Sequence, residues 1–249
     1  MGSSPVFNSR EWLVWQLADS AFPSGGFAHS AGLEAAWQQG AVRGGGQLAD
    51  LVAASLHHVG HSTLPFVTAA YDQPARWTEL DSMADACLNN HVANRASRLL
   101  GRAYLAAVER TFGLQLAAHK GRPGGEASAG RPPVQAASPP DAPPWSGAGL
   151  HGHWAPVFGA TSFLLQIGRE TVGRLFLFMH LRGLMAAAVR LNIVGPLEAQ
   201  KLQVRLSLPA EEVFKRCAEL TVDEAAQTSP LFDLWQSAHD RLPARLFQS

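Results

Sequence analysis

Histidines are the residues in this sequence whose spacing most directly suggests chemistry. His57 and His61 lie one helical turn apart, so their imidazole nitrogens could share a metal ion. No glutamate stands beside them and no third ligand can be assigned, so a polar helix face is the simpler interpretation. A metal-dependent helical hydrolase built on His57 and His61 is kept as the alternative function.

A second pair, His151 and His153, flanks Gly152 at the edge of a Gly/Pro-rich segment. These imidazoles could bind a soft divalent ion weakly, but solvated loop histidines are the simpler interpretation. Asp81 and Asp85 are also one turn apart, and they fit a hydrated helix face better than acid–base catalysis. The sequence therefore predicts no metal site and no cofactor.

Motifs of common enzyme classes are missing from the sequence. The segment Gly26–Gly32 lacks the Lys-Ser/Thr of a phosphate-binding loop, and no predicted strand precedes it. No Gly-x-Ser-x-Gly occurs, which argues against a serine hydrolase with a nucleophile elbow. We therefore expect a protein that is not an enzyme.

Composition points to a protein that works with partners. The chain has 249 residues, of which 47% are apolar and 16% charged, whereas ordinary soluble domains carry about 25% charged residues. A surface this poor in charge is typical of proteins covered by neighbours. Twenty basic residues balance twenty acidic ones, which argues against nucleic acid as a partner.

Cellular location is predicted from what the sequence lacks. It contains no apolar run of about 18 residues and no signal-like N-terminus, so we expect a cytoplasmic protein with no membrane contact. Cys87 and Cys217 are too few and too far apart for a disulfide framework, and both are interpreted as reduced core thiols.

Apolar residues recur at three-to-four spacing along almost the whole chain, which predicts an all-α, bundle-like single domain of about ten helices over 1–249. Residues 121–149 are an exception, because Gly, Pro, Ala and Ser dominate them; a flexible insertion is expected there. After a short helix around Trp12, the predicted helices cover about 28–39, 47–59, 62–72, 75–89, 92–118, 155–165, 171–192, a helix from Pro196, 209–222 and 230–246.

One segment, Leu17–Glu34, reads as an ordered loop rather than a linker. Pro23 stiffens the chain, and Gly25-Gly26 permits positive φ or a close backbone approach. Phe27, His29 and Glu34 then follow at a helix N-terminus, where their side chains act either as caps or as contact residues. Arg95, Arg98, Arg102 and Arg110 stripe a later helix; a solvated face is the simpler interpretation and an acidic partner the alternative.

These residues resemble the UreF family of urease accessory proteins. The family's N-terminal signature is matched at Leu17, Asp19, Pro23, Gly25, Gly26, Phe27, His29, Ser30, Gly32, Leu33 and Glu34. Further blocks are similar at Asn94–Ser97 with Gly101, at His153–Ala160, at Ala188–Gln200 and in the C-terminal tail. Pro243 departs from the family, which usually shows Tyr there, and the bend of the tail is therefore left open.

The resemblance implies an all-α, dimeric scaffold that binds the accessory protein UreD/UreH, recruits the GTPase UreG and so serves nickel insertion into apo-urease. It implies a partner-binding role for the signature residues Pro23, Gly25, Gly26, Phe27, His29, Ser30 and Glu34, and for Arg95 and Arg190. Large apolar residues of the tail would anchor it in a partner's groove: Phe232, Trp235, Leu246 and Phe247. A nickel carrier with its own site at His29 or at His57 and His61 is a third hypothesis.

Overall fold

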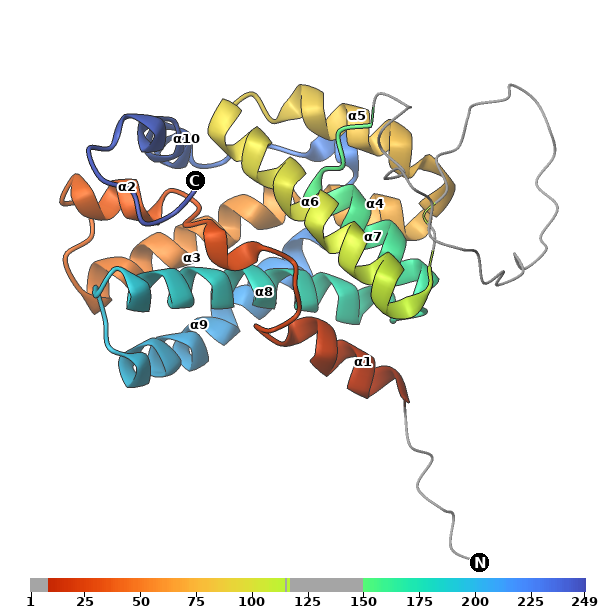
Figure 1. The fold of residues 1–249 in the computed structure, drawn as a ribbon, viewed down its shortest axis with the longest axis horizontal. Helices are drawn as coiled ribbons and strands as arrows, with labels where there is room; N and C mark the ends of the chain where they lie inside the picture. Colours follow the sequence, from red (N-terminus) through yellow and green to blue (C-terminus); the bar gives the residue numbers. More distant parts are fainter. Residues whose placement is uncertain (1–8, 115, 117–149) are drawn as a thin grey trace, which may run out of the picture.

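The computed structural model describes residues 9–114, 116 and 150–249. These residues form helices and connecting segments without a β-strand among them, which confirms the all-α prediction (Figure 1). The α-helices are α1 (Ser9–Ala18), α2 (Leu33–Gln38), α3 (Gly45–Ser62), α4 (Leu64–Asp72), α5 (Trp77–Cys87), α6 (His91–Phe112), α7 (Trp154–Leu164), α8 (Arg169–Arg190), α9 (Pro196–Cys217) and α10 (Pro230–Ala238). The 3-10 turns are η1 (Gly26–Ala28), η2 (Pro74–Arg76), η3 (Val222–Glu224) and η4 (His239–Arg241). The predicted insertion at 121–149 lies outside the described residues.

The core is built where small residues let helix backbones approach. Helix α4 packs along α7, and α9 packs against both α3 and α8. A Cβ atom on Gly159 of α7 would lie only 2.1 Å from the carbonyl oxygen of Val67 on α4. Such a distance leaves no room for a side chain, so this contact requires glycine.

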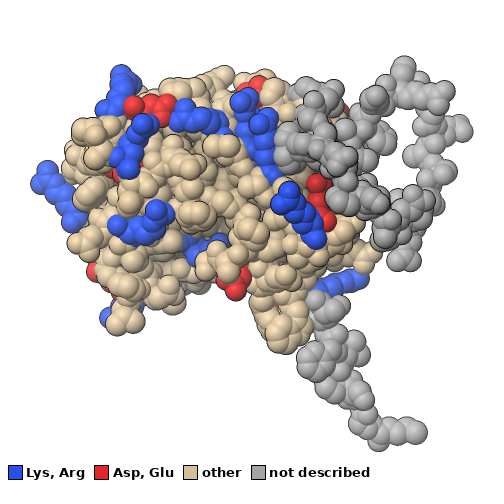
Figure 2. All heavy atoms as spheres, in the orientation of Figure 1, with Lys and Arg blue, Asp and Glu red and all other residues tan. Residues whose placement is uncertain are grey.

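Helix α8 is a long helix with a continuous apolar stretch. By length and composition alone it is long enough to cross a membrane, but 61% of its apolar window is buried inside the protein. Burial of this extent is the pattern of a core helix. The low content of charged residues is also visible at the surface. In Figure 2, most of the face in view carries neither basic nor acidic side chains.

Several predicted boundaries were wrong. The predicted helix at 28–39 begins only at Leu33, because Gly32 adopts a left-handed backbone with φ 86° at the N-cap. The helix expected from Pro196 and the one expected at 209–222 are a single helix, α9, with Pro209 in its interior. An interior proline costs about 3 kcal/mol, but Val213, Phe214 and Cys217 continue the buried face beyond it.

Two predictions about side-chain surroundings also need correction. Cys87 was expected in the core, but it is exposed at the end of α5, whereas Cys217 is buried as expected; both are free thiols. Asp81 was assigned to a hydrated helix face, but it is fully buried. Its carboxylate accepts hydrogen bonds from the backbone N–H groups of His151, Gly152 and His153, at 2.7, 3.0 and 2.6 Å.

Candidate functional site

The signature segment and the end of the chain meet in one place, which we call the tail junction: Gly25–Glu34 together with Leu246–Ser249. In Figure 1 the C-terminus lies next to α2. Two backbone hydrogen bonds join the segments, from Gln248 N to Ala28 O at 2.8 Å and from Ser30 N to Ser249 O at 2.6 Å. Residues more than two hundred positions apart therefore pair through their main chains.

Glu34 is the main polar anchor of the tail junction. It is only 2% exposed. Its carboxylate accepts hydrogen bonds from the backbone N–H of Leu246 at 2.6 Å and of Phe247 at 3.2 Å, and His239 Nε2 lies 3.2 Å from it. A buried carboxylate is tolerated where donors surround it. Glu34 thus anchors the chain's own C-terminal tail by accepting its backbone hydrogen bonds.

His29 and Ser30 hold the last residue. His29 Nδ1 is hydrogen-bonded with the hydroxyl of Ser249, and the Ser30 hydroxyl donates to Ser249 O at 3.1 Å. Burial, with smaller electrostatic contributions from the neighbouring His239 and Arg95, lowers the pKa of His29 from 6.5 to about 4. His29 is therefore neutral in the folded protein at neutral pH.

The protonation of His29 predicts that the tail loosens in mild acid. A depressed pKa means that the unfolded chain binds more protons than the folded one between pH 6.5 and about 4. Stability contributed by neutral His29 is thus complete above pH 6.5 and falls, by about 1–3 kcal/mol, as the pH approaches 4. The protection of the Gln248 amide against hydrogen exchange, relative to its intrinsic exchange rate at each pH, should fall over the same range.

The control for this pH dependence is His29→Asn. Other buried histidines titrate in the same range, such as His180, whose pKa burial lowers to about 4, so only the difference between wild type and variant reports on His29. If the two proteins lose tail protection in parallel as the pH falls, His29 is not the responsible group.

Two arginines of the helices contact the tail and the signature loop. Arg190, at the end of α8, donates to the carbonyl of Phe27, and its guanidinium carbon lies 4.3 Å from the centre of the Phe247 ring. Arg95 makes a bidentate pair with Asp240, at 2.7 and 3.1 Å. Arg95 and Arg190 therefore make contacts within this chain, and so does Arg102, whose Nε donates to His151 O.

The large apolar residues of the tail divide into two sets. Phe232 and Phe247 are buried, and Trp235 is half-buried against Gly32. The exposed ones are Leu231 at 59%, Leu234 at 65% and Leu246 at 51%. The predicted terminal helix at 230–246 ends instead at Ala238, and the chain continues through η4 into an extended tail. Leu242, next to Pro243, has the extended backbone that a residue before proline prefers.

The remaining signature residues shape the loop. Gly25 has a left-handed backbone with φ 76°, as the sequence suggested for the Gly25-Gly26 pair. Gly26 does not: a Cβ there would meet Ser24 Oγ only at an ordinary 3.7 Å. Phe27 is 73% exposed and Pro23 is also exposed, so these two face outward while Ser30 and Glu34 face the tail.

The histidine pair of the alternative hypothesis is engaged locally. The rings of His57 and His61 stack with centroids 4.1 Å apart, and His61 Nδ1 is hydrogen-bonded with His57 O at 2.9 Å. Cys217 Sγ lies 3.5 Å from His61 Nδ1. No carboxylate joins them in a metal-sized group within the part of the chain that the structure describes. Among the described residues, the geometry thus gives the hydrolase hypothesis no carboxylate ligand.

Sequence reasoning missed one cluster. His153 was expected to be solvated, but it is 1% exposed because Asp81 draws its backbone into the core. Its Nε2 lies 3.0 Å from Asp85 Oδ1. The sequence feature that could have indicated this cluster is the spacing of Asp81 and Asp85. They lie one turn apart on α5, so both carboxylates are on the face that meets the 151–153 loop.

Fold and site define an all-helical protein whose N-terminal signature holds its own C-terminus. A family model described as UreF matches residues 42–207. The chain is 36% identical over 252 residues to urease accessory protein F of Arabidopsis thaliana, covering 99% of this chain and 95% of the relative. It is 35% identical over 238 residues to urease accessory protein F of Oryza sativa subsp. japonica, covering 95% and 84%.

A bacterial relative, urease accessory protein UreF of Bacillus sp. (strain TB-90), is 23% identical over 255 residues and covers 97% of this chain. The chain belongs to the UreF family of urease accessory proteins. Its role is therefore an accessory one in urease maturation, in association with other urease accessory proteins.

Proposed function

We propose that this chain is a cytoplasmic, homodimeric scaffold without catalytic activity of its own. It binds a UreD/UreH-type accessory protein through its tail and recruits a UreG-type GTPase, so that nickel is inserted into apo-urease. GTP hydrolysis belongs to the partner. The observation that carries this proposal is the apolar surface that Leu231, Leu234 and Leu246 expose. The backbone N–H groups of Leu246 and Phe247 in the same tail already have an acceptor, Glu34.

The tail helix supports a docking role because its two faces differ. Phe232 of α10 and His239 of the following turn η4 are buried, whereas Leu231 and Leu234, three positions apart on α10, are exposed on one face. Large apolar side chains exposed together are favourable in a complex and unfavourable in water. Packing of α10 against α2 and α6, together with the contact of the following His239 with Glu34, fixes this face relative to the rest of the fold.

Size-exclusion chromatography with light scattering tests the scaffold directly. The chain alone should elute as a homodimer, and it should form a stable complex with a UreD/UreH-type protein. Addition of a UreG-type GTPase should enlarge that complex. If UreG and urease form an equally stable, nickel-loaded assembly without this chain, the scaffold function is wrong.

Substitution of the exposed leucines should weaken the partner contact without unfolding the chain. We expect Leu231→Ser with Leu234→Ser to reduce affinity for the UreD/UreH-type partner by about 2 kcal/mol or more, because both side chains are free to be buried by it. The melting temperature should stay near that of wild type. Isothermal titration with the purified partner measures the change.

A matched control changes two other exposed apolar residues, Val204→Ser with Leu208→Ser on α9, which are 74% and 73% exposed. An equal loss of affinity in this control would mean that the partner also contacts α9 and that the effect is not specific to the leucines of α10. Phe232→Ala, by contrast, should lower the stability of the chain itself, because Phe232 is buried at 3% exposure.

A further inference from the structure

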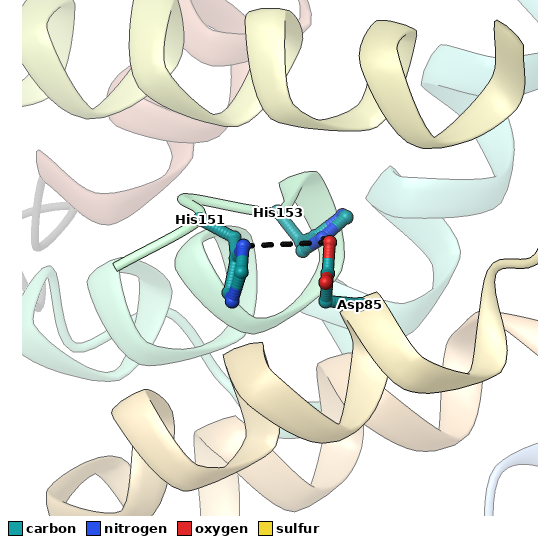
Figure 3. A group of neighbouring side chains, drawn as sticks. All are labelled: Asp85, His151 and His153. Carbon is teal, nitrogen blue, oxygen red and sulfur yellow. Dashed lines mark hydrogen bonds and ion pairs between the residues drawn. The ribbon is translucent and has the colours of Figure 1, made fainter. Parts of the chain in front are cut away.

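Asp85, His151 and His153 bring three potential metal ligands together (Figure 3). Asp85 lies on α5, and the two histidines precede α7. His153 Nε2 lies 3.0 Å and His151 Nδ1 3.4 Å from Asp85 Oδ1. All three ligand atoms lie within 4.8 Å of one another. Metal–ligand bonds of about 2.0–2.2 Å place neighbouring ligand atoms about 3.0–3.6 Å apart, so small side-chain adjustments suffice.

The backbone that carries the histidines is fixed by groups outside the cluster. Asp81 accepts hydrogen bonds from three successive N–H groups, those of residues 151, 152 and 153. Both of its oxygens are thereby engaged by the backbone, and Asp85 is the carboxylate beside the imidazoles. Such preorganisation reduces the entropy lost on binding an ion.

His153 has the second partner that a metal-bound histidine needs. Its Nδ1 lies 3.1 Å from the hydroxyl of Ser97, which also accepts a hydrogen bond from Trp154 N. Without an ion, the Nε2–H donates to Asp85. When an ion takes its place, the imidazole proton moves to Nδ1, where Ser97 accepts it, and the lone pair of Nε2 binds the ion. Burial lowers the pKa of His153, which favours the neutral, coordinating form.

Asp85 is a suitable anionic ligand. Burial opposes its ionisation, but hydrogen bonds from Asn94 and His153 lower its pKa below the ordinary value, so the carboxylate is charged at neutral pH. The side chains of Asp85 and His151 are 30% and 31% exposed, so an ion reaches them from solvent. Arg98 is the competing cation: its Nη1 lies 3.8 Å from Asp85 Oδ1, and its side chain is 38% exposed and can move into water.

We propose that Asp85, His151 and His153 bind one divalent first-row transition-metal ion of the Zn²⁺ or Ni²⁺ type. Two imidazoles and one carboxylate form a donor set that these ions prefer over Mg²⁺ and Ca²⁺. Water completes the coordination, since three protein ligands leave at least one position open. This site is a property of the chain alone and is independent of the scaffold function.

Isothermal titration of the purified, tag-free chain with ZnCl₂ and with NiCl₂ tests the proposal. One equivalent should bind, and His151→Ala should weaken binding by at least about tenfold. His151 is part-exposed, so this variant should keep the circular dichroism and melting temperature of wild type. Arg98→Ala should tighten binding, because it removes the competing cation.

The matched control is His57→Ala, which removes one member of the other histidine pair and should leave the affinity unchanged. X-ray absorption of the zinc-loaded chain should show only nitrogen and oxygen ligands; Cys87 lines a cavity of about 40 Å³ that His153 also lines, so sulfur is the relevant competitor. The proposal is overturned if the chain binds neither ion, if His151→Ala binds as wild type does, or if binding is lost with His57→Ala or involves sulfur.

Discussion

Replacing Glu34 by alanine should release the C-terminal tail and lower the free energy of unfolding by about 3–5 kcal/mol. The variant leaves the N–H groups of Leu246 and Phe247 without their acceptor and removes the carboxylate beside the fully buried His239. Buried donors that lose their partner carry the whole desolvation cost. Urea denaturation measures the stability, and hydrogen exchange at the Leu246 and Phe247 amides measures the release of the tail.

The controls separate tail release from a general loss of charge. Glu212→Ala removes an exposed carboxylate on α9 and should change stability by less than about 0.5 kcal/mol. Glu34→Gln keeps the shape and one carbonyl acceptor, so it should fall between wild type and Glu34→Ala. Unchanged protection of the Leu246 and Phe247 amides in Glu34→Ala would mean that Glu34 does not hold the tail.

If the scaffold proposal is correct, Glu34→Ala should also weaken the UreD/UreH-type contact. The reason is positional: the exposed leucines of α10 keep their chemistry, but the tail that orients them is no longer fixed. The Leu231 and Leu234 substitutions remove the apolar contact and leave the fold intact. The two sets of variants therefore distinguish the orientation of the docking surface from its composition.

Local signals in the sequence were enough for the fold class and for much of the helix pattern. Apolar spacing predicted helices, and Pro196 marked a helix start because proline fits the first turn. Pro209 misled for the same local reason. The residues that continue α9 past it, Val213, Phe214 and Cys217, are buried because α9 packs against α3 and α8, which no local pattern shows. At Pro209, tertiary packing outweighs the low helix propensity of proline.

The sequence singled out the signature and the tail as separate segments but not their contact with each other. Phe27 of the signature is exposed, and its role as a partner contact stays a prediction. Glu34 was expected near a helix N-terminus; its partners Leu246 and Phe247 are 212 and 213 positions away, and no local pattern encodes that pairing. The same applies to Asp81, whose three backbone donors lie some 70 positions further along the chain.

Gly101→Ala is the second substitution with a large expected effect. A Cβ at this position on α6 would lie 2.1 Å from Gly152 O, 2.7 Å from His153 C and 2.8 Å from Trp154 N. All three are backbone atoms, so no side chain can turn aside and α6 must separate from the 151–153 loop. We expect a loss of more than about 4 kcal/mol, measured by urea denaturation.

The matched control is Gly183→Ala in α8, where a Cβ would meet nothing within 4 Å. There the substitution should stabilise the helix by about 0.5–1 kcal/mol, because alanine loses less backbone entropy than glycine. If the free energy of unfolding falls for Gly101→Ala and rises for Gly183→Ala, close backbone approach, and not helix propensity, is the reason that position 101 requires glycine. Because Gly101 adjoins the loop that carries His151 and His153, its replacement should also weaken zinc binding, whereas Gly183→Ala should leave it unchanged.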